Sequence, residues 1–417
     1  MSQISSTIFT DFSHLGLPPS LLVALKNLNI VTPTPIQRQA IPVAIEGKDV
    51  VGVAQTGTGK TLAFALPLIS QISKNKKSGL VILPTRELAM QVNETFLKIG
   101  KNFGLKTALL IGGAPIHRQR AEIYRHPHVI IGTPGRIMDH MEQRTLRLNN
   151  VEVLVLDEAD HMFDMGFLPQ ITTILKQVPQ YRQTMLFSAT MPPAIMKLAA
   201  THMKLPVRVE IARPGTVAEH IRQELFIVSK DQKNRLLDKL LDENNGSILV
   251  FSRTKHGARK ICRSIKGMGH TAAEIHSNLS MSQRRRSLDG FKSGEHRVLV
   301  ATDIAARGID VSNIELVVNY DLPDNPDDYV HRIGRTGRNG RSGLAMTFVM
   351  PDQRNKIRII EKLVRKPLQI SPLPQLPPAR PMPVQLAEKN LSHGNNRGNF
   401  KNNFRNHRSH KREKFRV

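Results

Sequence analysis

One short stretch constrains this chain more than any other. Residues 54–61 read AQTGTGKT, a loop whose glycines let successive backbone N–H groups face a polyphosphate. Residues 48–53 before it have the pattern of a strand, and residues 62–66 after it that of a helix. Lys60 is expected to reach the β- and γ-phosphates, and the hydroxyl of Thr61 to help hold Mg²⁺. The stretch therefore predicts a strand–loop–helix unit that binds ATP or GTP.

A second signal comes from residues 153–160, which read VLVLDEAD. This is an apolar strand that ends in carboxylates, where a nucleotide site needs its metal-binding aspartate, here Asp157. Many buried strands end in an acid, so the pattern is weak alone. Combined with the phosphate-binding loop, it predicts that the nucleotide is also hydrolysed.

Composition predicts an ordinary α/β protein. The 417 residues allow two domains, with 40% hydrophobic and 5% aromatic residues. No apolar run approaches the ~18 residues that span a bilayer, and the first basic residue is Lys26, so the N-terminus does not resemble a secretory signal. We therefore expect no membrane association and a cytoplasmic location. The lone Cys262 cannot form an intrachain disulfide, and we expect it in the core on a helix.

Charge indicates the class of partner. Sixty Lys and Arg face 34 Asp and Glu, which gives a net charge of +26 and a pI near 10.5. A polyanion, and nucleic acid first, is the expected partner. The alternative is a generically basic or ribosome-associated surface.

Short apolar strands alternate with helical patterns in two stretches, which predicts parallel sheets with helices on both faces. The predicted strands are 50–54, 79–83, 107–111, 129–131, 153–156 and 184–187, then 247–251, 271–275, 298–301, 316–319 and 343–348. The second stretch has no phosphate-binding loop of its own. It is therefore expected to act as a partner to the first site.

These patterns predict a first domain at 1–211, a linker at 212–218, a second domain at 219–368 and a tail at 369–417. The tail begins Pro-rich, which excludes a helix or a central strand. Its last 25 residues hold eight Lys or Arg, one Glu and three Phe, and cannot bury a core. We expect this disordered segment to tether RNA, with a solubilising spacer as the alternative.

Further motifs follow in a fixed order. They are PTREL (84–88), GG (112–113), TPGR (133–136), DEAD (157–160), SAT (188–190), DIAARGID (303–310) and HRIGRTGR (331–338). The set resembles the DEAD-box RNA helicase family of superfamily 2 from about residue 12 to about residue 365. The short N-terminus, residues 251–258 and the basic tail are most similar to the bacterial RhlE-type branch. The resemblance implies two RecA-like domains in tandem, with ATP and Mg²⁺ as cofactors and RNA as partner.

The resemblance also assigns roles at the ATP site. Gln37 is similar to the glutamine that reads adenine, since an amide both donates and accepts. Asp157 and Thr61 are implied metal ligands, and Glu158 would activate the attacking water. Arg335 and Arg338 resemble arginine fingers that join Lys60 in catalysis. The implied nucleotide-binding residues are Phe12, Gln37, Thr56, Gly57, Thr58, Gly59, Lys60, Thr61 and Asp310.

For RNA, the resemblance implies contacts mainly with phosphates and 2′-hydroxyls, and hence little sequence dependence. The implied residues are Thr85, Arg86, Gly113, Thr133 and Arg136 in the first domain, and Arg253, Thr254, Gln283, Arg286 and Thr302 in the second. Ser188 and Thr190 are similar to the pair that couples hydrolysis to unwinding. An ordinary polar turn is the alternative for that pair. Arg284 and Arg285, beside Arg286, are expected to form a solvated basic face, and no specific role is assigned to them.

One departure from the family pattern concerns adenine. Asn29 and Ile30 stand where the family has Gly and an aromatic residue, and the lost stacking is worth about 0.5–1.5 kcal/mol. We expect weaker ATP affinity or looser adenine selectivity, partly compensated by Phe12. His161, which follows the DEAD motif, occupies a variable position, and we expect no metal role for it.

The resulting hypothesis is an ATP-dependent RNA helicase that separates short duplexes or remodels RNA–protein complexes when its two lobes close. The alternatives are an ATP-gated RNA clamp with little strand separation and a DNA helicase of the same superfamily, which the Gln37 and DEAD motifs disfavour. We expect a monomer whose tail contacts ribosomal particles or the RNA-decay machinery. The sequence does not identify the RNA.

Overall fold

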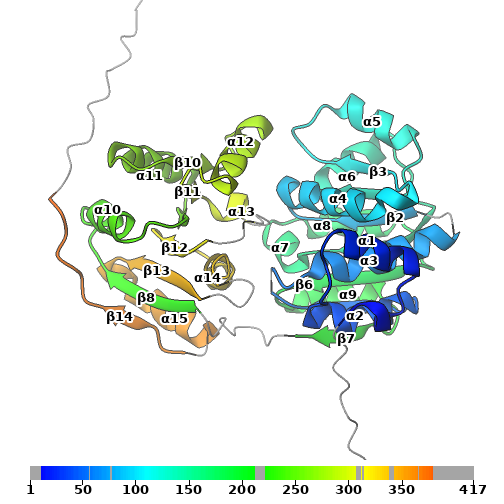
Figure 1. Ribbon diagram of the computed structural model, residues 1–417, viewed down its shortest axis with the longest axis horizontal. Coiled ribbons are helices and arrows are strands. Elements are labelled where there is room, and N and C mark those ends of the chain that lie inside the picture. Colours follow the sequence, from blue (N-terminus) through cyan, green and yellow to red (C-terminus); the bar gives the residue numbers. More distant parts are fainter. Residues whose placement is uncertain are drawn as a thin grey trace, which may run out of the picture. The chain divides into compact units, whose positions relative to one another are not determined.

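The computed structural model describes residues 11–55, 57–75, 78–211, 221–306, 311, 314–337, 342–364 and 366–378. These residues form two lobes, each built around its own seven-stranded parallel sheet (Figure 1). Thr56, Asp310 and Arg338, the predicted linker and most of the predicted tail lie outside the described residues.

The first lobe has the strand order β3-β4-β2-β5-β6-β1-β7. Its strands are β1 Val50–Val53, β2 Ser78–Ile82, β3 Thr107–Leu110, β4 Val129–Gly132, β5 Val151–Leu156, β6 Gln183–Ser188 and β7 Val207–Glu210. Its helices are α1 Pro19–Asn27, α2 Pro35–Ile45, α3 Lys60–Asn75, α4 Arg86–Gly100, α5 Ile116–Tyr124, α6 Pro134–Glu142, α7 Ala159–Asp164, α8 Leu168–Leu175 and α9 Pro193–His202. The 3₁₀ turns Ser13–Leu15 and Lys101–Phe103 complete it.

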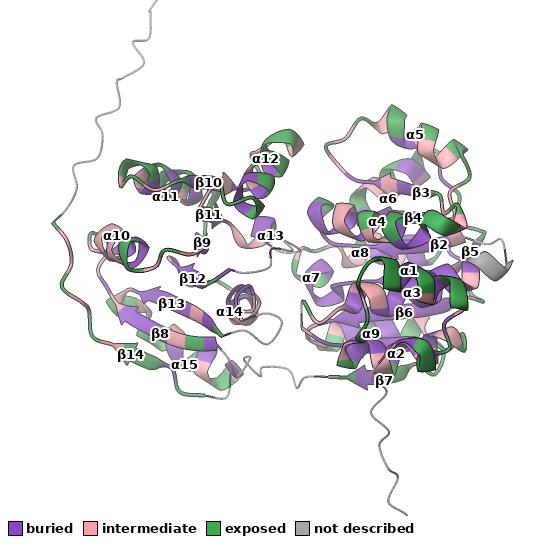
Figure 2. Cartoon of the chain, viewed as in Figure 1, coloured by how far each residue is buried: buried purple, intermediate pink, exposed green. Residues whose placement is uncertain are grey.

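Both faces of this sheet are covered by helices, and β1 and β4 are buried along their whole length (Figure 2). Successive residues of a strand point to opposite faces. In β5, Val153 and Val155 accordingly join the core cluster shared with α2, α3 and α4, whereas Leu154 and Leu156 join the cluster shared with α6, α8 and α9. This explains the near-continuous apolar runs that the sequence shows.

The second lobe repeats the topology, with the order β10-β11-β9-β12-β13-β8-β14. Its strands are β8 Ile221–Ile227, β9 Ile248–Phe251, β10 Ala272–Ile275, β11 Val298–Ala301, β12 Leu316–Asn319, β13 Gly343–Val349 and β14 Gln369–Ser371. Its helices are α10 Lys233–Glu243, α11 Lys255–Gly267, α12 Met281–Lys292, α13 Asp303–Ala306, α14 Pro326–Ile333 and α15 Arg354–Val364, with a 3₁₀ turn at Pro351–Gln353. Cys262 lies on α11 and is buried, as expected.

Three strands were absent from the sequence-based list, namely β7, β8 and β14. β7 and β14 are short edge strands with mostly exposed residues, so they lack the apolar run that marks the central strands. β14 pairs with β8 and extends the second sheet beyond residue 368. Arg235 then binds the carbonyl oxygen of Pro377 at 2.7 Å, so the start of the Pro-rich segment lies against the second lobe.

Parallel strands place all their carboxyl ends at one edge of a sheet, where ligands of open α/β folds bind. In the first lobe, the loops after β1, β5 and β6 carry the phosphate-binding, DEAD and SAT motifs. The loops after β2, β3 and β4 carry the PTREL, GG and TPGR motifs. Because the order is β3-β4-β2-β5-β6-β1, the predicted nucleotide and RNA motifs occupy adjacent halves of the same edge.

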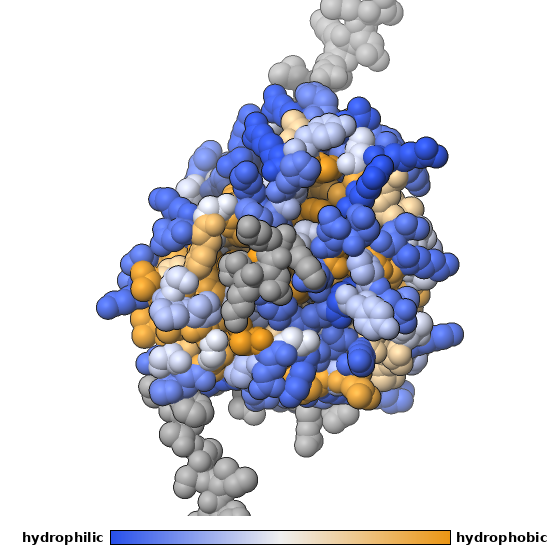
Figure 3. All heavy atoms as spheres, turned by 90° about the vertical axis from the view of Figure 1, so that its right-hand side faces the viewer, coloured by the Kyte–Doolittle hydropathy of each residue, from blue (hydrophilic) through white to orange (hydrophobic). Residues whose placement is uncertain are grey.

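The described surface carries no large continuous apolar face in the view of Figure 3, where hydrophobic side chains are scattered among hydrophilic ones. No helix among the described residues is long and apolar enough to cross a membrane.

Candidate active site

The phosphate-binding loop depends on two glycines. Gly57 and Gly59 have φ angles of 87° and 90°, which residues with a side chain rarely adopt. A Cβ on Gly59 would also lie 2.4 Å from Nε2 of Gln37. Lys60 begins α3 directly after the loop, and its Nζ is buried without a hydrogen-bond partner among the described residues. The loop thus leaves a buried cation available for an anionic ligand.

Gln37 joins α2 to this loop. Its Nε2 donates to the carbonyl oxygen of Gly59 at 2.9 Å, and its Oε1 accepts from the backbone N–H of Thr34 at 2.9 Å. An amide has two donor hydrogens and two acceptor lone pairs. One of each therefore remains, so this bridge does not exhaust the side chain that the sequence analysis assigned to adenine.

The DEAD motif holds its two leading acids in buried positions. Asp157 follows β5, and its Oδ1 accepts from the backbone N–H of Glu158 at 2.9 Å. Glu158 has φ 51° and ψ 52°, a left-handed conformation that costs a residue with a Cβ about 1–2 kcal/mol. Oε2 of Glu158 lies 3.1 Å from Nδ1 of His161, and all three side chains are buried. The strained backbone and the His161 contact together fix the Glu158 carboxylate.

The two acids have opposite pKa shifts. Burial raises the pKa of Asp157 to about 7, and the nearby charge of Lys60 only partly opposes it. Burial would also raise the pKa of Glu158, but the hydrogen bond and charge of His161, together with Lys60, leave it below its ordinary value. Glu158 is therefore ionised at neutral pH, whereas Asp157 gains from a further positive charge beside it.

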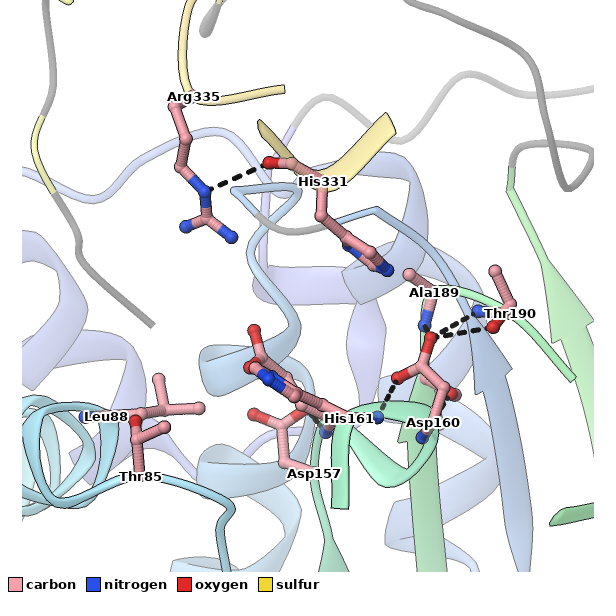
Figure 4. A network of polar contacts seen from close by, with 11 residues as sticks. Thr85, Leu88, Asp157, Asp160, His161, Ala189, Thr190, His331 and Arg335 are labelled. Atoms are coloured by element: carbon pink, nitrogen blue, oxygen red, sulfur yellow. Dashed lines mark hydrogen bonds and ion pairs between the residues drawn. The ribbon is translucent and has the colours of Figure 1, made fainter. Parts of the chain in front are cut away.

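The last acid of the motif connects it to the SAT motif (Figure 4). Oδ2 of Asp160 accepts from the N–H of Ala189 at 3.2 Å, and from the N–H and hydroxyl of Thr190 at 2.8 and 2.9 Å. The N–H of Asp160 donates to the hydroxyl of Ser188 at 3.1 Å. Burial would raise the pKa of Asp160, but nearby positive charge, that of Lys60 included, and the bonds from Ser188 and Thr190 leave it below its ordinary value. The sequence analysis did not single out Asp160, yet it links the ends of β5 and β6.

Asn29 and Ile30, which replace the Gly and the aromatic residue of the family pattern, differ in backbone conformation and burial. Asn29 has φ 56°, a conformation that suits Gly best and that Asn tolerates better than most residues. Ile30 is half-buried against the first core. Phe12 is 3% exposed and belongs to that core, so its compensating contact with adenine stays a prediction.

The predicted RNA residues of the first lobe meet at the β3-β4-β2 half of the edge. Arg86 begins α4 and lies so close to the GG motif that a Cβ on Gly112 or Gly113 would be 2.9 or 2.3 Å from its guanidinium nitrogens. Arg136 donates from Nη1 to the carbonyl oxygen of Ala114 at 3.0 Å. A single hollow includes Thr85, Arg86, Gly112, Thr133 and Arg136.

A buried histidine network supports this hollow and was missed by the sequence analysis. Nδ1 of His140 lies 2.8 Å from the hydroxyl of Thr145, and its Nε2 lies 3.3 Å from Oε1 of Gln119. Nε2 of Gln119 donates to the carbonyl oxygen of Ile111 at 2.9 Å. Burial lowers the pKa of His140. With its proton on Nε2, a neutral imidazole donates to Gln119, while Nδ1 and the carbonyl oxygen of His140 share the single hydroxyl proton of Thr145. The network ties α6 through α5 to the residue before the GG motif.

In the second lobe, Arg332 is an anchor. It forms two bonds with the Asp303 carboxylate, at 2.5 and 2.7 Å, and lies over the Phe251 ring at 5.0 Å. This fixes α14 to the start of the DIAARGID motif. Nε of Arg335, in the turn after α14, donates to the carbonyl oxygen of His331 at 3.2 Å. Arg338 and Asp310 lie outside the described residues.

The predicted RNA residues of the second lobe occupy the corresponding half of its edge. Thr254 caps α11, with its Oγ1 accepting from the N–H of Gly257 at 3.0 Å, and Thr302 follows β11. Gln283 and Arg286 are exposed on α12. Arg284 between them is buried and bonds to the carbonyl oxygen of His276 at 3.1 Å, so the expectation of a solvated basic face is wrong for this residue.

Comparison with known proteins decides the family. Residues 34–198 match the DEAD/DEAH box helicase domain, and residues 232–340 match the helicase conserved C-terminal domain. The DEAD-box ATP-dependent RNA helicase CshA of Bacillus cereus is 44% identical over 370 residues, which cover 88% of this chain and 70% of that protein. This chain belongs to the DEAD-box helicase family. The ATP-dependent RNA helicase CshA of Listeria monocytogenes is 42% identical over 363 residues, 86% of this helicase and 70% of the relative.

Solved structures agree with this assignment. The S. cerevisiae Dbp5 structure bound to RNA and ADP BeF3 has a TM-score of 0.80 at 31% identity, and the match covers 88% of this helicase and 96% of Dbp5. Mss116p bound to ssRNA and AMP-PNP has a TM-score of 0.79 at 27% identity, over 85% and 77% of the two chains. The tandem RecA-like fold is thereby confirmed. The RhlE-type branch stays a prediction, since these bacterial relatives are named CshA.

Proposed function

We propose that this ATP-dependent RNA helicase binds ATP at the open edge of its first lobe and uses hydrolysis to separate short RNA duplexes. The observation that carries the proposal is the buried Lys60 ammonium, which has no hydrogen-bond partner among the described residues although Asp157 lies in the same site. Burying an unpaired charge is costly. A site built in this way suits a polyphosphate.

The donor set also fits Mg²⁺. Asp157 and the Thr61 hydroxyl are hard oxygen ligands of the kind that Mg²⁺ prefers. Burial raises the pKa of Asp157, and the charge of Lys60 only partly offsets it, so a further cation would favour the ionised carboxylate. We propose that these two residues hold the ion, directly or through water. Bound there, Mg²⁺ would neutralise charge on the phosphates.

We propose that Glu158 acts as the general base in hydrolysis. Its lowered pKa keeps it ionised, so its carboxylate can orient and accept a proton from the attacking water. His161 is a positioning residue that holds this carboxylate through its Nδ1, 3.1 Å from Oε2 of Glu158. Arg335 and Arg338, both from the second lobe, would stabilise charge in the transition state, and Asp310 would contact the ribose.

The remaining nucleotide contacts are proposed as the sequence analysis assigned them. Gln37 retains a donor and an acceptor for adenine, and the loop backbone faces the phosphates. The proposed nucleotide-binding set is Phe12, Gln37, Thr56, Gly57, Thr58, Gly59, Lys60, Thr61 and Asp310.

RNA is proposed to cross the β3-β4-β2 half of the first lobe and the β10-β11-β9 half of the second. The proposed residues are Thr85, Arg86, Gly113, Thr133, Arg136, Arg253, Thr254, Gln283, Arg286 and Thr302. Hydroxyls, guanidinium groups and backbone amides suit phosphates and 2′-hydroxyls. Binding of ATP and RNA would bring the lobes together, and Ser188 and Thr190 would couple that closure to hydrolysis through Asp160.

The deciding experiment measures steady-state ATP hydrolysis with and without single-stranded RNA at fixed salt, for wild type and Glu158→Gln. Salt is fixed because phosphate contacts make RNA affinity steeply salt-dependent. We expect RNA to stimulate hydrolysis by the wild-type protein. In Glu158→Gln, the kcat measured with RNA should be lower by about 10²–10⁴-fold, because the general base is lost. Equal hydrolysis without RNA, or in the variant, would refute the mechanism.

A duplex-separation assay under the same conditions distinguishes a helicase from an ATP-gated clamp. A clamp would retain RNA for as long as ATP is bound without releasing the complementary strand. A matched DNA strand in the hydrolysis assay tests the choice of nucleic acid. The monomeric state and a tail that contacts ribosomal particles or the RNA-decay machinery remain proposals for pull-down and sedimentation experiments.

A further inference from the structure

The outer face of α11 differs in charge from that of α10, the helix that shares its side of the second sheet. Lys255–Gly267 contains Lys255, His256, Arg259, Lys260, Arg263 and Lys266 but no acidic residue, and all six side chains are exposed. Its apolar residues are buried in the core cluster that it shares with α10. The helix therefore presents one basic face to solvent.

This face is unbalanced by its neighbours. The acids of α10, on the same side of the sheet, are paired elsewhere or buried: Glu243 pairs with Lys239 at 2.8 Å, Asp242 lies 3.4 Å from His270, and Asp238 is buried. Among the described residues, no carboxylate oxygen lies within 4 Å of the charged nitrogens of Arg259, Arg263 or Lys266. A basic face without compensating acids repels itself unless an anionic partner covers it.

The position of α11 connects this face to the proposed RNA site. The N-cap of the helix is Thr254, beside Arg253, at the carboxyl edge of the sheet where RNA is proposed to bind. Because it connects parallel strands β9 and β10, it runs back along the sheet away from that edge. From Lys255 to Lys266 the axis rises about 16 Å, a length that matches about five phosphates of a stacked strand.

We infer that the basic face of α11 is a second RNA-binding surface, which takes the backbone of the RNA segment that extends beyond the site at the sheet edge. This inference rests on the proposed function. It gives the helicase a preference for RNA long enough to reach both surfaces, without any base recognition.

The test uses the full chain and two charge-matched variants. Arg259→Gln/Arg263→Gln/Lys266→Gln removes three charges from α11. Arg354→Gln/Arg358→Gln/Lys362→Gln removes three exposed charges from α15, which packs into the cluster on the opposite face of the sheet. Fluorescence anisotropy in the presence of a non-hydrolysable ATP analogue measures affinity for single-stranded RNAs of increasing length, starting from the shortest that binds the wild-type protein.

For the α11 variant we expect unchanged affinity for the shortest RNA and about tenfold weaker affinity for long RNA. The slope of log K against log salt should fall by up to about 2 for long RNA, since each single-strand phosphate contact contributes about 0.7. The α15 variant should behave as wild type at every length. Equal losses for short and long RNA, equal losses in both variants, or no loss at all would overturn the inference.

The outcome is separable from that of the proposed function. If RNA fails to stimulate hydrolysis in wild type, the proposed function fails, whereas the length dependence of binding is still measured. If RNA stimulates hydrolysis but the α11 variant shows no length-dependent loss, only the α11 surface is refuted. An acidic protein partner would then be the remaining ligand class for this face.

Discussion

The two lobes share one topology but use a matched position in opposite ways. β1 lies between β6 and β7, and β8 lies between β13 and β14. The helix after each strand begins with a lysine, Lys60 in α3 and Lys233 in α10. Lys60 Nζ has no hydrogen-bond partner among the described residues, whereas Lys233 Nζ donates to the carbonyl oxygen of Tyr320 at 2.7 Å and to the carboxylate of Asp321 at 2.9 Å.

The aspartates at matching positions of the two lobes also differ, in the direction of their pKa shifts. Asp157 follows β5 and Asp321 follows β12, which occupy equivalent places in the two sheets. Burial raises the pKa of Asp157 to about 7. Burial acts in the same direction on Asp321, but Lys233 outweighs it and lowers its pKa. In the second lobe, Lys233 and Asp321 therefore form an ion pair with each other. The corresponding residues of the first lobe, Lys60 and Asp157, are left to bind a ligand.

The connecting loops explain why. Gly57 and Gly59 have positive φ angles, and such turns let successive backbone N–H groups face a phosphate. Residues 228–232 contain no glycine, and their backbone cannot form that cradle. A repeated fold therefore does not imply a repeated site. The loop chemistry decides which copy binds the nucleotide.

The largest expected effects come from substituting the two matched lysines, Lys60 and Lys233. Lys60→Ala should lower kcat/KM for ATP by about 10²–10³-fold, because it removes a charge that would stabilise the phosphates. Lys233→Ala should leave ATP affinity intact but reduce the free energy of unfolding by about 3–5 kcal/mol, because Asp321 loses its buried partner. ATP hydrolysis and urea unfolding of both variants measure the contrast.

A double variant, Lys233→Met/Asp321→Asn, serves as the control. Without an orphaned charge it should unfold at higher urea than Lys233→Ala. A loss of ATP affinity in Lys233→Ala equal to that in Lys60→Ala would contradict the division of roles between the lobes.

The next effect concerns the link that only the first lobe has, between Asp160 and the SAT motif. Thr190→Val removes the hydroxyl donor while keeping the shape and the backbone N–H. A hydrogen bond to a charged group is worth about 1.5–3 kcal/mol. We expect duplex separation to fall about tenfold or more, and RNA-stimulated hydrolysis to fall less. If both rates fall in parallel, Thr190 acts in chemistry and not in coupling; Thr190→Ser, which keeps the donor, should restore the wild-type ratio.

A smaller effect is expected in the support of the RNA half. Gln119→Leu breaks the connection from His140 to the carbonyl oxygen of Ile111, at about 1–3 kcal/mol for the unsatisfied groups. The apparent KM for RNA should rise by about tenfold, while the KM for ATP stays unchanged. Gln119→Glu still accepts a hydrogen bond from His140, so its apparent KM for RNA should lie between those of wild type and Gln119→Leu. A change confined to the KM for ATP would argue against this role.

The smallest effect is in pH dependence. The pKa of Asp321 is lowered in the folded state, so its contribution to stability is present above the unfolded value of 3.8 and is lost as pH falls through the lowered value. The difference in unfolding free energy between wild type and Asp321→Asn should therefore shrink in acid. Asp157 has the opposite sign, since its raised pKa makes stability fall as pH rises from 3.8 towards 7. Chemical unfolding from pH 3 to 8, roughly the range where these carboxylates titrate, distinguishes the two.

The sequence by itself determined the features that rest on local pattern. The alternation of apolar runs and helical segments placed the central strands within a residue or two, as for β11 at Val298–Ala301. The spacing of glycines around Lys60 predicted the turn that the structure contains. Each of these signals lies within one strand, loop or helix, where backbone geometry depends on neighbouring residues alone.

Only the tertiary structure decided which distant side chains meet. Nothing adjacent to Gln119 in the chain signals that it contacts His140 and supports the GG motif. The same holds for Lys233, which reads as a surface lysine until β12 brings Asp321 to it. β14 is recognisable only through its pairing with β8. Such contacts depend on strand order, and strand order depends on the burial of both sheet faces over the whole lobe, which no short segment encodes.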